Sequence, residues 1–106
     1  MRRHHRIAVV ARPGRPDERW HSLDALAHQL LIEAGDQALT VRHAVAARTS
    51  PSWPSGQCVA VRMEAGLLAY VFMGSFALPD DDACLRRALE RATRQRARTV
   101  QLRKAA

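Results

Sequence analysis

Four arginines near the C-terminus are spaced so that they would share one side of a helix: Arg87, Arg91, Arg94 and Arg98. At about 100° per residue, these positions fall within an arc of about 60°. The apolar residues of the same segment are centred about 140° away, and they are Leu85, Ala88, Leu89 and Ala92. Guanidinium groups form paired hydrogen bonds with phosphate and carboxylate oxygens. This arginine stripe therefore predicts binding of DNA, RNA or an acidic protein surface.

The net charge of the chain is concentrated in the same segment. The 106 residues carry a formal net charge of +7. Residues 1–85 hold nine arginines and nine carboxylates, whereas residues 86–106 hold seven arginines, one lysine and one acidic residue, Glu90. We expect Glu90 to pair with Arg94 at i+4. A local block of positive charge favours a polyanionic partner. A solvated helix face that keeps a small protein soluble has the same composition, so both interpretations stay open.

The remaining polar residues form no catalytic or metal-binding pattern. His21 and His28 are seven residues apart on a predicted helix, about 10 Å along its axis, which is too far for one metal ion. Cys58 and Cys84 lack zinc-site spacing and lie in apolar runs, so we expect two free thiols. There is no glycine-rich phosphate loop. We therefore expect a non-enzymatic binding protein without catalytic residues, cofactor, metal or small-molecule substrate.

Hydrophobic periodicity and turn residues predict the elements that would hold these side chains. Asp17 is the expected N-cap of the first helix and Gly35 its end, and three aspartates cap the second helix. In chain order the prediction is a strand over 6–11, a helix over 18–34, strands over 39–45 and 59–64 joined by a loop over 48–57, a strand over 67–78, a helix from 81 to about 97, and an optional strand over 99–103.

This order, β-α-β-β-β-α with or without a final β, predicts an α+β fold. Short connections between successive strands favour an antiparallel sheet, here of four or five strands. Two amphipathic helices would cover one face of it and form a two-layer sandwich. We expect a single domain over residues 1–106, with disordered tails at 1–5 and 104–106. The strand order in the sheet stays open.

The strand over 67–78 is apolar on both faces, although the helices can cover only one. We therefore expect an exposed apolar face that carries Arg42, Arg62, Tyr70 and Phe72. Such a patch is typical of a homodimer interface, and aromatic rings beside arginines can also stack nucleobases. A homodimerising adaptor protein is accordingly the alternative function.

The N-terminal residues and the cysteines predict a cytoplasmic location. The apolar run after the basic start, Ile7 to Ala11, is shorter than the hydrophobic region of a signal peptide. No stretch of the sequence has the length and hydropathy of a membrane span. Free cysteines are typical of a reducing compartment.

Overall fold

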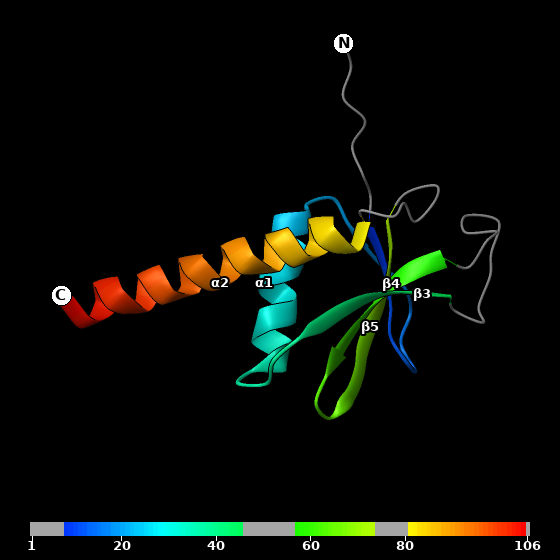
Figure 1. Cartoon of the computed structure of the whole chain (residues 1–106), viewed down its shortest axis with the longest axis horizontal. Coiled ribbons are helices and arrows are strands. Elements are labelled where there is room, and N and C mark those ends of the chain that lie inside the picture. The colour runs from blue at the N-terminus through cyan, green and yellow to red at the C-terminus, as the bar shows by residue number, and fades with distance from the viewer. Residues whose placement is uncertain (1–7, 46–56, 74–80, 106) are drawn as a thin grey trace, which may run out of the picture.

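The computed structural model describes residues 8–45, 57–73 and 81–105. Within them, five strands form one sheet in the order β2-β1-β5-β4-β3, and every neighbouring pair is antiparallel. Both helices lie on the same side of the sheet (Figure 1). The predicted two-layer α+β fold is thus confirmed. The elements are β1 (Ala8–Ala11), β2 (Glu18–Trp20), α1 (Leu23–Ala34), β3 (Thr40–Val45), β4 (Gln57–Met63), β5 (Gly66–Met73) and α2 (Asp81–Ala105).

The main core lies between the sheet and the two helices. The pairs Val10–Val71 and Val71–Val59 are in register across β1, β5 and β4, so these three side chains share one face. They pack against apolar residues of both helices, and the fully buried members include Leu26, Leu30 and Leu85. Because side chains alternate along each strand, the neighbouring residues point to the opposite face of the sheet. We call this opposite side the outer face.

The first helix begins later than the sequence predicts. Residues 18–20 form β2, which pairs with β1 in the register Ala8–Trp20 and Val10–Glu18. The N-cap is Ser22, whose Oγ accepts a hydrogen bond from the backbone N of Ala25 at 3.1 Å. The prediction of Asp17 as the cap was therefore wrong. The predicted stop at Gly35 is confirmed.

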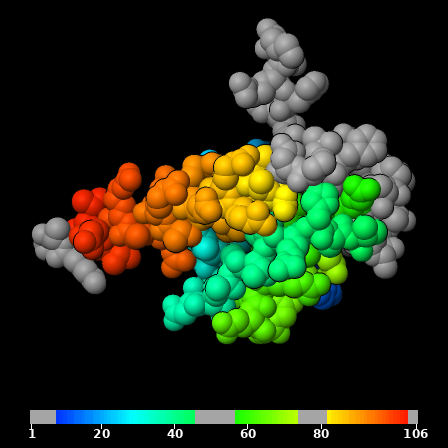
Figure 2. Space-filling view, in the orientation of Figure 1, coloured from blue at the N-terminus to red at the C-terminus, as the bar shows by residue number. Residues whose placement is uncertain are grey.

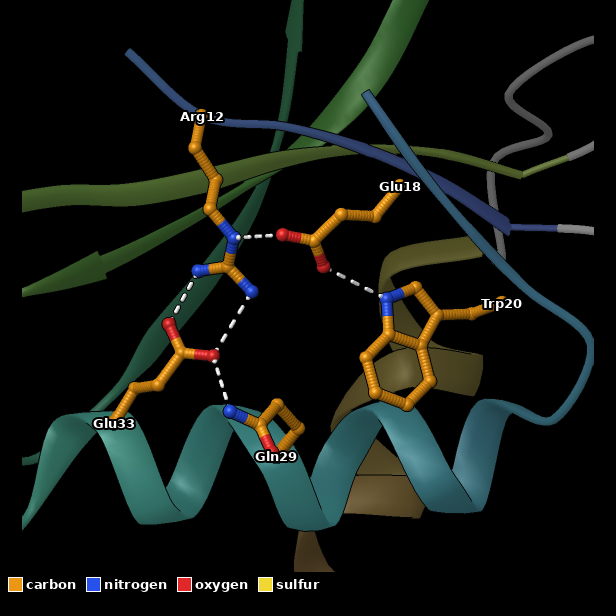
Figure 3. Close-up of polar contacts among 5 residues, drawn as sticks. All are labelled: Arg12, Glu18, Trp20, Gln29 and Glu33. Carbon is orange, nitrogen blue, oxygen red and sulfur yellow. Dashed lines mark hydrogen bonds and ion pairs between the residues drawn. The ribbon is translucent and has the colours of Figure 1, made fainter. Parts of the chain in front are cut away.

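A buried arginine ties β1 and β2 to α1 (Figure 3). Arg12, which follows β1 and is 7% exposed, forms a bidentate pair with Glu33, with Nη2 at 2.9 Å from Oε2. Its Nε also donates to Glu18 Oε2 at 3.0 Å. Each carboxylate has a further donor, Trp20 Nε1 at 3.1 Å for Glu18 and Gln29 Nε2 at 2.9 Å for Glu33. This charge network fixes α1 against the sheet edge.

The second helix is longer than predicted. It runs to Ala105, so the predicted strand over 99–103 and the predicted tail at 104–105 were wrong. The β-branched pair Thr99–Val100 suggested a strand, but good helix formers surround it and no glycine or proline interrupts the segment. The predicted tail at 1–5, most of the loop over 48–57 and the end of the strand over 67–78 lie outside the described residues.

Candidate functional site

The second helix has two parts with different surroundings. In its first half the predicted apolar face is confirmed, because Leu85, Ala88, Leu89 and Ala92 are all buried in the main core. From Thr93 to Arg103, in contrast, every residue is exposed. Residues 93–105, here called the helical extension, project past α1 and away from the sheet, as the orange-to-red end of α2 in Figures 1 and 2 shows. At 1.5 Å per residue, the extension is about 20 Å long.

The helical state of the extension follows from its attachment to the docked half. Starting a helix is the unfavourable step, since several residues are fixed for one hydrogen bond, whereas each added residue contributes a further bond. Packing of residues 81–92 provides that start. Alanine, leucine, glutamine, arginine and lysine then continue the helix at little cost. The extension therefore keeps its shape without a buried face of its own.

The extension and the turn before it form a uniformly basic surface. Residues 91–105 contain five arginines, one lysine and no acidic residue. The members of the arginine stripe differ in whether they already form a hydrogen bond or ion pair within the protein. Arg91 donates to Asp24 Oδ1 of α1 from Nη2 at 2.9 Å and from Nε at 3.3 Å. Arg87 donates from Nη2 to Cys84 Sγ at 3.4 Å.

The other two members of the stripe are available for a ligand. Within the described part of the chain, Arg94 and Arg98 are exposed and have no ion-pair partner. The expected pair between Glu90 and Arg94 is therefore not formed, and the acidic partner of the stripe is Asp24, from a different helix. Two free guanidinium groups thus lie where the helix leaves the body of the protein.

Two further arginines that the stripe did not include lie on the opposite side of the extension. Arg96 and Arg103 are seven residues apart, so they point about 20° from each other and about 170° from the middle of Arg94 and Arg98. Arg96 Nη1 donates to the carbonyl of Leu31 at 3.3 Å, and Arg103 is exposed. Arg96 fell inside the predicted helix but off the arginine stripe, and Arg103 fell beyond the predicted end of the helix near 97. The available signal was the unbroken run of good helix formers after residue 100.

An open hollow of about 550 Å³ lies where the extension leaves α1. Its boundary on α1 is His28, whose Nε2 is 2.7 Å from Gln95 Oε1 of α2. Along the extension it is lined by arginines from both sides of the helix and by the residues between them: Arg96, Arg98, Thr99, Val100, Leu102 and Arg103. The hollow is therefore bordered by positive charge on two sides.

The outer face of the sheet carries the expected residues but is less exposed than predicted. The register Arg42–Ala60–Tyr70 and the pair Thr40–Arg62 place Arg42, Arg62 and Tyr70 on this face, as expected. Phe72 shares it but is 2% exposed, and Tyr70 is partly buried, so the expectation that these rings form an exposed patch was wrong. The exposed large apolar side chains of the described residues lie elsewhere. The homodimer stays a prediction, for which light scattering is the test.

The described residues hold no cluster of metal ligands. Among them, no three His, Cys, Asp or Glu side chains are grouped to hold a metal ion. Cys58 is buried in the outer-face cluster and Cys84 packs against the main core, and neither forms a disulfide. Of the helices within these residues, none is long and apolar enough to span a membrane. Comparison of the chain with protein-family models, curated proteins and solved structures gives no match.

Proposed function

We propose that this protein binds nucleic acid through the helical extension of α2. The observation that carries the proposal is the charge of an exposed, preformed helix, with six basic residues and no acidic one over residues 91–105. A nucleic-acid backbone presents regularly spaced phosphates to which such a helix is complementary. Four of the basic side chains on the extension are arginines, which bind phosphate oxygens with two parallel hydrogen bonds.

An acidic protein surface is the other polyanionic partner that the sequence left open. Protein interfaces usually have a core of apolar and aromatic side chains that lose contact with water. On the extension, the exposed large apolar residues are Val100 and Leu102, which are 50% and 67% exposed. They are two residues apart and point about 160° from each other, so they cannot form one patch. The extension therefore fits a phosphate backbone better than a protein interface.

The spacing of the free arginines also favours a bound anion. Arg94 and Arg98 are related by i, i+4, which brings two positive charges together on the helix surface. Such a like-charge pair destabilises a helix by about 0.2–0.5 kcal/mol. A phosphate bound between the two guanidinium groups would replace this repulsion with attraction. The arrangement is thus mildly unfavourable in the free protein and favourable in a complex.

Binding to fluorescently labelled duplex DNA and RNA at about 50 and 200 mM salt tests the proposal. With about three to five phosphates contacted, the logarithm of affinity for duplex DNA should fall with the logarithm of salt at a slope of about −2.7 to −4.5. Arg94→Ala and Arg98→Ala should each flatten that slope by about one. Arg19→Ala, which removes an exposed arginine from β2, is the matched control and should change nothing. Failure of the wild type to bind either nucleic acid at the lower salt would refute the proposal.

A further inference from the structure

We infer that the helical extension enters the major groove of duplex DNA, an inference that rests on the proposed function and names its ligand. The arginines of the extension form two rows on opposite sides of the helix, Arg94 with Arg98 and Arg96 with Arg103. A flat polyanion would engage one row and leave the other in water. A groove has two phosphate walls, so both rows find partners at once when Arg96 exchanges the carbonyl of Leu31 for a phosphate.

The dimensions of the helix and of the groove agree. An α-helix with its side chains is about 10–12 Å wide, and the major groove of B-form DNA is about 12 Å wide. Residues 93–96 of the extension lie beside α1 and the segment before β3, and no described residue after Arg96 is hydrogen-bonded or ion-paired to another element. Residues 97–105 therefore project freely over about 13 Å. This length lets about two and a half turns of helix lie along the groove.

The side of the extension that faces the hollow provides the surface for the floor of the groove. Thr99 and Leu102 line the hollow between the two arginine rows. A threonine hydroxyl can bond base edges, and an apolar side chain can contact the methyl group of thymine. Thr99 Oγ1 now donates to the carbonyl of Gln95 at 3.0 Å, a local bond that a base edge can replace. Arginines would thus position the helix on the backbone while Thr99 and Leu102 lie against the bases.

Two other nucleic-acid classes fit the extension less well. The major groove of A-form RNA is deep and narrow, so side chains on a helix do not reach its bases. Proteins that bind single strands stack bases on aromatic rings, and residues 81–105 contain no aromatic residue. Duplex DNA is the class whose shape and charge both match the extension.

Binding in the major groove requires an intact helix, whereas charge attraction alone does not. One substitution distinguishes these two modes of binding. Ala97→Pro retains every charge but removes a backbone donor and clashes with the preceding turn, so the helix should break within the extension. Ala97 is exposed and distant from the buried residues Leu85 to Ala92, so the fold should persist. Ala97→Gln, which keeps the helix, is the matched control.

The experiment measures the affinities of the full chain for duplex DNA, duplex RNA and single-stranded DNA of equal length at one salt concentration. Duplex DNA should bind at least about tenfold more tightly than the other two. Ala97→Pro should weaken duplex binding by about tenfold or more, with circular dichroism reporting the lost helix, and Ala97→Gln should bind as the wild type does. Methyl green, which occupies the major groove, should compete, whereas the minor-groove ligand distamycin should not.

The outcomes separate this inference from the proposed function. Equal or tighter binding of RNA or single strands, or undiminished binding by Ala97→Pro, would overturn the major-groove inference and leave nucleic-acid binding standing. Competition by distamycin alone would do the same. No binding of any of the three nucleic acids would overturn both.

Discussion

Arg91 of α2 and Asp24 of α1 form an ion pair in which two guanidinium nitrogens, at 2.9 and 3.3 Å, share one carboxylate oxygen. The two residues are 67 positions apart in the chain, and both side chains are at least half exposed. The pair lies at the base of the helical extension, where α2 crosses α1. It therefore holds a negative charge beside the surface that we propose binds phosphates.

Asp24→Asn should raise the affinity for nucleic acid by a few-fold at low salt. The substitution frees Arg91 and removes a charge that repels phosphate, so the slope of log affinity against log salt should steepen by up to about one. Stability should change by less than about 1 kcal/mol, since exposed ion pairs contribute little. Glu64→Gln in the β4–β5 turn removes an equal charge from an exposed position and serves as the control. Weaker binding by Asp24→Asn would show that Asp24 positions Arg91 for the ligand.

The four arginines of the stripe should contribute unequally. Arg98→Ala should weaken binding more than Arg91→Ala, because Arg98 is free in the described structure whereas Arg91 must first leave Asp24. By the same reasoning Arg87, which is engaged with Cys84, should contribute less than Arg94. Salt titrations of the four single alanine variants provide the measurement. Four equal slope changes would mean that the ion pair with Asp24 opens freely in solution.

Loss of Arg12 should destabilise the fold. Arg12→Ala leaves two partly buried carboxylates, Glu33 and Glu18, beside each other without their common counter-ion. We expect the free energy of unfolding in urea to fall by about 2–4 kcal/mol. The free energy of unfolding of Arg12→Lys should lie between those of the wild type and Arg12→Ala, because a lysine keeps the charge but cannot form the bidentate pair. A loss below about 0.5 kcal/mol for Arg12→Ala would mean that water compensates for the missing guanidinium.

The same network predicts a loss of stability in acid. Partial burial tends to raise the pKa of Glu18, but hydrogen bonds from Trp20 and Arg12 and the nearby charges of Arg12 and Arg15 outweigh it, so this pKa lies below its ordinary value of 4.5. A carboxyl with a lowered folded-state pKa stabilises the fold above its unfolded-state pKa, and the contribution disappears as the pH falls through the folded-state value.

Glu18→Gln should accordingly be less stable than the wild type at pH 7, and the difference should shrink as the pH falls below about 4. Thermal unfolding of both proteins between pH 3 and 7 measures it. A difference that stays constant over this range would assign the effect of Glu18 to packing and not to its charge.

The two cysteines should react at different rates. Cys58 is fully buried, whereas Cys84 is partly buried on α2. In the native protein a thiol reagent should modify Cys84 well before Cys58, and two thiols should be found after denaturation under reducing conditions. Rapid modification of Cys58 would show that the outer-face cluster opens in solution.

Local periodicity was sufficient to predict much of this fold. The strands β3 and β4 follow the alternation of their side chains, β5 lies in a continuous apolar run, and the buried face of α2 follows the helical period. These patterns are local because the repeat of a strand or a helix fixes which residues share a face. The same alternation placed Arg42, Arg62 and Tyr70 on one face of the sheet. The arginine stripe was predictable in the same way.

Other features depend on contacts between distant residues. Glu18 to Trp20 fit a helical pattern, yet they form β2 because β1 offers them backbone partners. The burial of Phe72 and the pairing of Arg91 with Asp24 likewise depend on the tertiary structure. The second row of arginines exists because the docked half of α2 starts a helix that Thr99 and Val100 would not start alone. Sequence thus determined which side chains are positive and how they repeat, whereas packing of the first half of α2 decided that Arg96 and Arg103 lie opposite Arg94 and Arg98.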